Sequence, residues 1–340
     1  MGIVLLFLLY SLLFSSCVKP YLPKTDKYDT LLVVDGIVTD MPGPYTIRLS
    51  KSTKIIQFSP LQPYTDCNVK LSDNLGNSEM LREISNGIYK TDSLNGIQTV
   101  AGRKYKLTIA TPDGNIYESE EEMLNKGISI DSVHAQIESR PDNKFGYQFY
   151  LDFGPLTSDQ CLLWQLEKTY KYTADFAALS STYRTCFTTK SILEINTYNN
   201  SQHMQSETKK FPLYYEDNYS KALTIRYSLK IDQYTIDKDA YDYWKQIKKI
   251  MAEQGEIYSH QPYQVKSNIQ SIVNPNTFAL GYFMVAGLDE KRIFLNRPSI
   301  PFLYPVCVHN PPSEDPVQCH DCREDEGGNG YLQKPSFWID

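Results

Sequence analysis

The stretch LLVVDGIVTDMPGPYTIRLS, residues 31–50, decides the fold prediction. The run from Leu31 to Val34 is apolar throughout, and from Tyr45 to Ser50 apolar and polar side chains alternate. Alternation with a period of two is typical of a half-buried strand. The Met41-Pro42-Gly43-Pro44 segment between the two runs is typical of a turn. The sequence therefore predicts two strands joined by a turn.

The same pattern continues along the chain to about residue 125. Apolar side chains alternate from Cys67 to Leu71 and from Tyr105 to Ile109, and turn residues follow each run. Several short strands with turn signals at this spacing favour an antiparallel sandwich of the immunoglobulin or fibronectin type. We therefore expect a mainly β protein whose first domain is such a sandwich, over residues 30–125. The acidic run at residues 118–122, ESEEE, is interpreted as a solvated edge of this domain.

A second β-rich domain is predicted over residues 126–306. Strand patterns recur at 133–137, 147–153 and 162–166, and a further strand is expected at 222–231. The polar segment 173–222 is predicted to form long loops, which are frequent sites of binding surfaces.

One amphipathic helix is predicted within this second domain, over residues 238–254. Asp237 is a suitable N-cap residue, and Gly255 is a suitable stop. An apolar stripe at helical spacing is predicted to face the core, formed by Ala240, Trp244, Ile247 and Met251.

The start of the chain indicates export. Residues 2–14 are an apolar run, shorter than the roughly 20 residues that a transmembrane helix needs. Such a run fits the hydrophobic region of a signal peptide, here residues 1–16, although a buried strand or helix is the alternative. Phe14-Ser15-Ser16-Cys17 is similar to the lipobox of bacterial lipoproteins, in which Cys17 is acylated. The expectation is a lipid anchor at Cys17, followed by a tether over residues 17–29.

The net charge and the absence of common enzyme motifs argue against nucleic-acid binding and against catalysis. The formal net charge is −6, with 34 basic and 40 acidic side chains, so there is no basic surplus to attract nucleic acid. The sequence contains no G-x-S-x-G, H-E-x-x-H, P-loop or dinucleotide-binding motif. We therefore expect a protein that is not an enzyme and that needs no cofactor.

Cysteines are concentrated near the end of the chain, in a Gly- and Pro-rich tail at residues 307–340 that lacks apolar periodicity. In an exported protein such cysteines are expected to form disulfides. The predicted pairs join Cys307 either to Cys186 or within the tail, and Cys319 to Cys322. The alternative is a zinc site with the donors Cys307, His309, Cys319 and Cys322.

Four stretches of the sequence together resemble one known family. They are residues 31–50, 234–258, 265–295 and the terminal CHDCREDEGGNGYLQKPSFW at 319–338. This combination is similar to the domain-of-unknown-function family DUF4249. The resemblance implies an outer-membrane lipoprotein of Bacteroidetes-type bacteria that works beside a TonB-dependent transporter, and it transfers no catalytic residues.

The expected function is therefore that of an outer-membrane lipoprotein that binds a ligand or assists a transporter in uptake or assembly. Two alternatives stay open: a structural or adhesive surface module, and a surface hydrolase. Surface-exported lipoproteins of this kind tend to carry acidic residues after the lipidated cysteine. Here Val18-Lys19-Pro20 follow it, which leaves the face of the membrane open.

Overall fold

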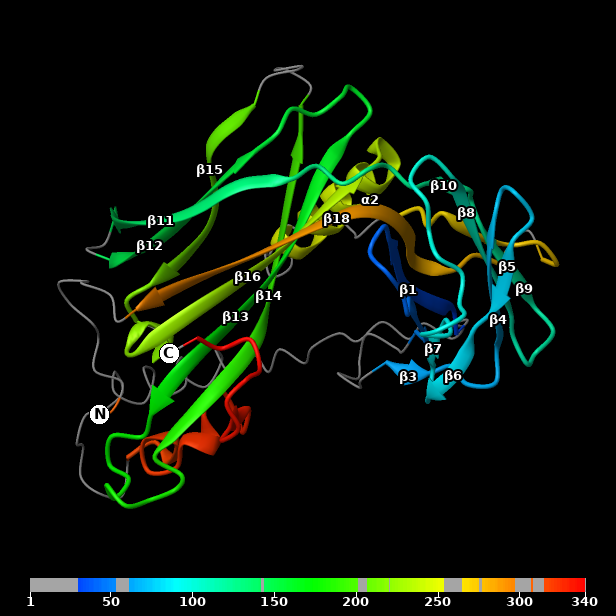
Figure 1. Cartoon of the computed structure of the whole chain (residues 1–340). Coiled ribbons are helices and arrows are strands. Elements are labelled where there is room, and N and C mark those ends of the chain that lie inside the picture. The colour runs from blue at the N-terminus through cyan, green and yellow to red at the C-terminus, as the bar shows by residue number, and fades with distance from the viewer. Residues whose placement is uncertain are drawn as a thin grey trace, which may run out of the picture.

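The computed structural model describes residues 30–52, 61–141, 144–200, 207–219, 221–253, 265–274, 277–296, 307 and 315–339. These residues form a mainly β protein, as predicted (Figure 1). Cys17, the signal peptide and the tether lie outside the described residues. Within the part that is described, no helix has both the length and the apolar character required to cross a bilayer.

The largest sheet extends through both halves of the molecule and contains ten strands. In spatial order these are β19 (Gly330–Tyr331), β14 (Thr185–Asn199), β13 (Cys161–Thr173), β16 (Arg226–Ile236), β18 (Leu280–Asn296), β1 (Leu32–Thr39), β2 (Thr46–Lys51), β7 (Ile88–Lys90) and β6 (Arg82–Ser85), with β3 (Gln62–Pro63) beside β2.

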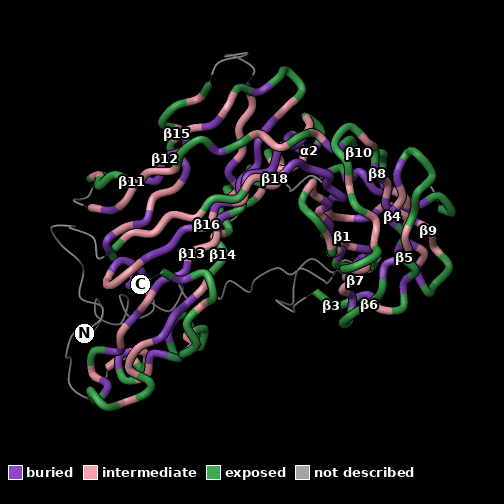
Figure 2. Tube along the Cα trace, viewed as in Figure 1, coloured by how far each residue is buried: buried purple, intermediate pink, exposed green. Residues whose placement is uncertain are grey.

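A six-stranded sheet covers the N-terminal end of this large sheet. Its order is β17 (Ile269–Ser271), β9 (Ile116–Ser119), β8 (Lys104–Ala110), β4 (Asn68–Asp73) and β5 (Ser78–Met80), with β10 (Glu122–Met123) beside β8. Alternate side chains of both sheets enclose one apolar core, as the burial pattern along these strands shows (Figure 2). The predicted alternation around Ile47 and Leu107 is confirmed, because both side chains are buried there.

A three-stranded sheet covers the other end of the large sheet. It contains β11 (Ile130–Arg140), β12 (Lys144–Phe153) and β15 (Thr208–Asp217), in that order. A second core, rich in aromatic side chains, fills the space between this sheet and strands β13, β14 and β16. Trp164 is fully buried there and donates its Nε1–H to Gln233 at 2.9 Å.

Strand β18 joins the two halves. Its first part pairs with β1 in parallel, from Leu280 to Ala286, and its second part pairs with β16 antiparallel. Gly281 allows the close approach to β1: its φ is +87°, and a Cβ atom there would lie 1.9 Å from the carbonyl oxygen of Val34. Strands β17 and β18 therefore complete an N-terminal sandwich that was expected to end at residue 125, and one of its pairings is parallel.

The predicted helix is present as α2 (Lys238–Glu253). Asp237 accepts a hydrogen bond from the backbone N–H of Ala240 at 2.9 Å, which confirms the predicted N-cap. The helix packs on the outer face of the large sheet near the junction of the two halves, against β13 and β14 (Figure 1). The predicted core stripe is only partly correct, because Ala240 is buried whereas Met251 is 46% exposed.

The prediction of long loops over residues 173–222 is only partly correct, because β14 and β15 occupy half of this segment. Both strands place polar side chains, including threonine, lysine and glutamate, between their inward-facing residues. Because of this polar composition, the alternation of inward- and outward-facing residues in β14 and β15 is not evident from the sequence. Three short 3-10 helices are also present among the described residues: η3 (Lys221–Leu223), η4 (Val317–Cys319) and η5 (Cys322–Glu324).

Candidate functional site: a charged cleft beneath the C-terminal tail

Charged side chains lie inside the second half of the molecule. Glu216 on β15 is 3% exposed and accepts two hydrogen bonds from the Lys168 ammonium group on β13, at 3.0 and 3.1 Å. The hydroxyls of Tyr214 and Tyr227 also donate to this carboxylate, at 2.7 and 3.2 Å. A buried carboxylate needs such partners to offset the loss of water. Glu216 therefore links β13, β15 and β16.

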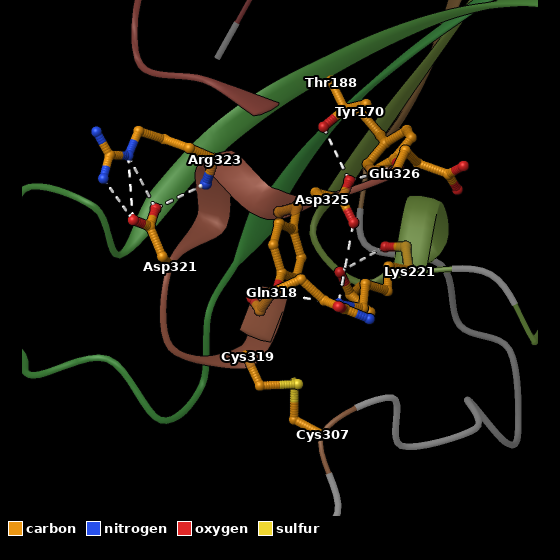
Figure 3. Close-up of polar contacts among 12 residues, drawn as sticks. Tyr170, Thr188, Lys221, Cys307, Gln318, Cys319, Asp321, Arg323, Asp325 and Glu326 are labelled. Carbon is orange, nitrogen blue, oxygen red and sulfur yellow. Dashed lines mark hydrogen bonds and ion pairs between the residues drawn. A yellow bond between two sulfur atoms is a disulfide. The ribbon is translucent and has the colours of Figure 1, made fainter. Parts of the chain in front are cut away.

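Asp325 forms a second buried centre, which comes from the C-terminal tail (Figure 3). Its carboxylate is 3% exposed and accepts hydrogen bonds from Tyr170 at 2.6 Å and Thr188 at 2.9 Å. The Nζ atom of Lys221 lies 3.9 Å from the other carboxylate oxygen and donates to the Tyr172 hydroxyl at 3.1 Å. Asp325 thus fixes the tail against β13, β14 and η3.

Two disulfides hold the tail in this position. Cys186 on β14 is bonded to Cys322, and Cys307 is bonded to Cys319. The second pair is the within-tail alternative for Cys307. The predicted bond between Cys319 and Cys322 is wrong. The 3-10 turns of η4 and η5 direct the two side chains to different partners, one within the tail and one on the sheet.

The zinc alternative does not fit the tail as the structure describes it. His309 lies outside the described residues, and the other three proposed donors are bonded in disulfides. A cysteine that binds zinc must be a free thiolate, which a disulfide sulfur is not. Among the described residues there is no group of three or more potential metal-binding side chains.

Two further cysteines among the described residues, Cys67 and Cys161, are free and buried. Burial raises the pKa of each thiol to about 11, so neither is activated as a nucleophile.

A cavity of about 590 Å³ opens between β15 and the tail. We name it the tail cleft. Its walls include the two buried centres and an outer rim that carries Asp217, Tyr219 and Glu324. The lining holds two lysines, Lys168 and Lys221, and a larger set of carboxylates: Glu216, Asp217, Glu324, Asp325 and Glu326.

Burial controls the protonation of the groups in the cleft. It lowers the pKa of Lys221, while the neighbouring Asp325, Asp175 and Glu326 act in the opposite direction. Burial and the hydrogen bond to Asp325 raise the pKa of Tyr170, so this phenol stays a hydrogen-bond donor. Donors from the protein occupy Glu216 and the Oδ2 atom of Asp325. The arrangement favours binding of polar groups over proton transfer to a substrate.

A separate polar cluster lies at the junction of the two halves. Glu122 on β10 is 5% exposed and accepts hydrogen bonds from Asn268 at 2.7 Å and Tyr282 at 3.0 Å. Its carboxyl group also hydrogen-bonds Asp237, the N-cap residue of α2. Burial, and then the nearby charge of Asp237, raise the pKa of Glu122 to about 8. The interpretation of residues 118–122 as a solvated run is therefore wrong for Glu122.

The model of a domain of unknown function, DUF4249, matches residues 18–292. The chain belongs to this family. In this DUF4249 protein the matched residues include both halves, the junction cluster and the β13, β15 and η3 walls of the tail cleft, whereas the tail from Cys307 onward lies beyond the match. No curated protein matches the chain.

The sequence motifs that carried the resemblance have structural roles at the junction. Asn268 bridges Glu122 and the backbone of Phe283, accepting from its N–H at 3.0 Å and donating to its carbonyl oxygen at 2.8 Å. Gly281 provides the close approach of β18 to β1.

The charged centres of the tail cleft were missed by sequence reasoning. One signal was present: Lys168 has the same strand parity as the inward-facing Leu166 and Tyr170.

Proposed function

We propose that this DUF4249 protein is a lipid-anchored, non-enzymatic binding protein of the outer membrane that assists a TonB-dependent transporter in uptake or assembly. The observation that carries the binding role is the tail cleft, in which a disulfide-held tail closes a polar cavity over a rigid sheet. Rigid elements that hold preoriented polar groups are typical of binding sites.

Three features support the proposed location. The lipobox-like residues end at Cys17, immediately before the first residue of the family match. The two disulfides favour an oxidising compartment outside the cytoplasm. A tether between Cys17 and the first strand would keep the folded part near the membrane, which raises its effective concentration beside a membrane partner.

Binding is favoured over hydrolysis because the two buried carboxylates of the tail cleft do not form a free acid–base pair. Every partner of Glu216 comes from the protein, namely Lys168, Tyr214 and Tyr227. Asp325 presents only its Oδ1 atom to the cleft, 3.9 Å from the Lys221 ammonium group, because Oδ2 accepts from Tyr170 and Thr188. A general base needs an accessible lone pair within reach of the substrate proton.

The test is gentle detergent extraction of the tagged chain from its own cells, followed by mass spectrometry. We expect an acylated N-terminal cysteine and a co-purifying β-barrel transporter. The Cys17→Ala variant should lose both the acyl mass and membrane retention, whereas the Lys19→Ala control should keep them. An unacylated, water-soluble wild-type chain, or purification without any transporter, would contradict the proposal.

A further inference from the structure

The inner end of the tail cleft contains a donor and an acceptor that do not meet. The Nζ atom of Lys221 and the Oδ1 atom of Asp325 are 3.9 Å apart, beyond hydrogen-bond distance. Lys221 is 9% exposed and has three N–H donors, of which the contact to Tyr172 uses one. The Oδ2 atom of Asp325 accepts from Tyr170 and Thr188, so Oδ1 is the oxygen that faces the gap.

The distance between Lys221 Nζ and Asp325 Oδ1 determines which chemical group can bridge the two atoms. A group placed about 2.8 Å from both atoms must accept a hydrogen bond from the ammonium group and donate one to the carboxylate. A hydroxyl does both with one oxygen atom, whereas a carboxylate or a carbonyl oxygen can only accept. An ammonium group in the gap would lie against the charge of Lys221.

The outer end of the cleft excludes anions and favours donors. Asp217 on β15 and Glu324 on η5 both line it. Among the described residues, neither carboxylate forms an ion pair with a lysine or arginine, unlike Glu216 and Glu326, which pair with Lys168 and Lys190. Tyr219 lies at the same rim and is 43% exposed.

These positions fit one class of ligand. We propose that the tail cleft binds a neutral polyhydroxylated molecule, a saccharide, with one hydroxyl bridging Lys221 and Asp325 and further hydroxyls donating to Asp217 and Glu324. The apolar face of a sugar ring would pack on Tyr219. The cavity of about 590 Å³ lies within the range of small-molecule sites. This inference rests on the proposed binding role and gives it a ligand class.

The test is isothermal titration of the full chain in detergent with maltotriose, cellotriose and mannotriose as neutral probes. Spermidine serves as a cationic probe and citrate as an anionic one. We expect saturable binding of at least one trisaccharide and none of citrate. Tighter binding of spermidine than of every trisaccharide would overturn the proposal, as would the absence of trisaccharide binding, which would leave water as the occupant of the gap.

Single substitutions test whether a trisaccharide binds in the tail cleft. Lys221→Met keeps an unbranched apolar side chain and removes the ammonium donors, and it should weaken trisaccharide binding at least tenfold. Asp217→Asn, at the less buried rim, should weaken it a few-fold without affecting the fold. Lys249→Met is the matched control, since it removes a lysine from the exposed pair with Glu253 on α2, away from the lining of the cleft, and it should leave the affinity unchanged.

Unchanged affinity in both Lys221→Met and Asp217→Asn would overturn the proposed site. Recovery of the transporter does not depend on these titrations, so failure of saccharide binding and failure of the transporter proposal are distinguishable.

Discussion

The two sandwiches of this protein share one continuous sheet but are stabilised differently. Between β1 and β10 the core is almost entirely aliphatic and aromatic, with exposed ion pairs such as Arg48–Asp35 on its surface. In the second sandwich, buried ion pairs lie beside the aromatic core, and a disulfide connects β14 to a tail with little apolar surface of its own. A core of apolar side chains specifies a compact fold, whereas buried charges at fixed positions create a place for polar recognition.

The largest effect is expected from removing the disulfide that only the second sandwich contains. Cys186 and Cys322 are 136 residues apart, and a crosslink that closes a loop of about 100 residues contributes about 4.7 kcal/mol in the chain-entropy model. The double alanine variant should lower the unfolding free energy of the second sandwich by about 4–5 kcal/mol. Denaturant unfolding monitored by hydrogen exchange measures the two sandwiches separately.

Two control variants provide a comparison for this loss of stability. The Cys307–Cys319 bond spans only 12 residues, so its removal should cost about 3 kcal/mol. Cys161→Ala removes a free buried thiol and should cost less than either. If the first sandwich lost as much stability as the second, the proposed difference between them would be wrong.

The next effect compares a buried ion pair with an exposed one. Glu216→Ala leaves Lys168 without its carboxylate partner, and breaking a buried pair in this way typically costs about 3–5 kcal/mol. Asp35→Ala breaks the pair with Arg48, in which both side chains are more than half exposed, and should cost less than about 1 kcal/mol. Urea unfolding of both variants provides the test, and equal losses would contradict the comparison.

The last effect concerns pH at the junction between the two sandwiches, and for each pH unit it is smaller than the loss expected for Glu216→Ala. The folded-state pKa of Glu122, about 8, is above its usual value of 4.5, so between these values the folded state binds more protons than the unfolded state. Stability should therefore fall as pH rises from 5 to 8, by up to about 1.4 kcal/mol per pH unit.

Glu122→Gln keeps the hydrogen bonds to Asn268 and Tyr282 possible and removes the titration. Its stability should depend less on pH across this window than that of the wild type. Hydrogen exchange of the first turn of α2, which Asp237 caps, reports the same event locally. A wild-type profile that rises with pH over this range, or an unchanged slope in Glu122→Gln, would show that Glu122 does not titrate as described.

Sequence reasoning succeeded where one face of a strand is apolar and the other polar. The strands around Ile47 and Leu107 were predicted because their alternation is uninterrupted. It failed for β14 and β15, in which threonine, lysine and glutamate lie among the inward-facing aromatic residues. The charged centres of the tail cleft were also missed, because Lys168 and Glu216 are 48 residues apart and meet only after β13 and β15 pack together.

The sequence by itself determined the mainly β class, the amphipathic helix with its cap at Asp237, and membership of the family, because these depend on patterns within short windows. Tertiary structure decided which cysteines pair, how β18 joins two sandwiches, and where buried carboxylates find their partners. The physical reason is distance along the chain: hydrogen bonds and disulfides act over a few ångströms, and only the folded backbone brings Asp325 to Tyr170 or Glu122 to Tyr282.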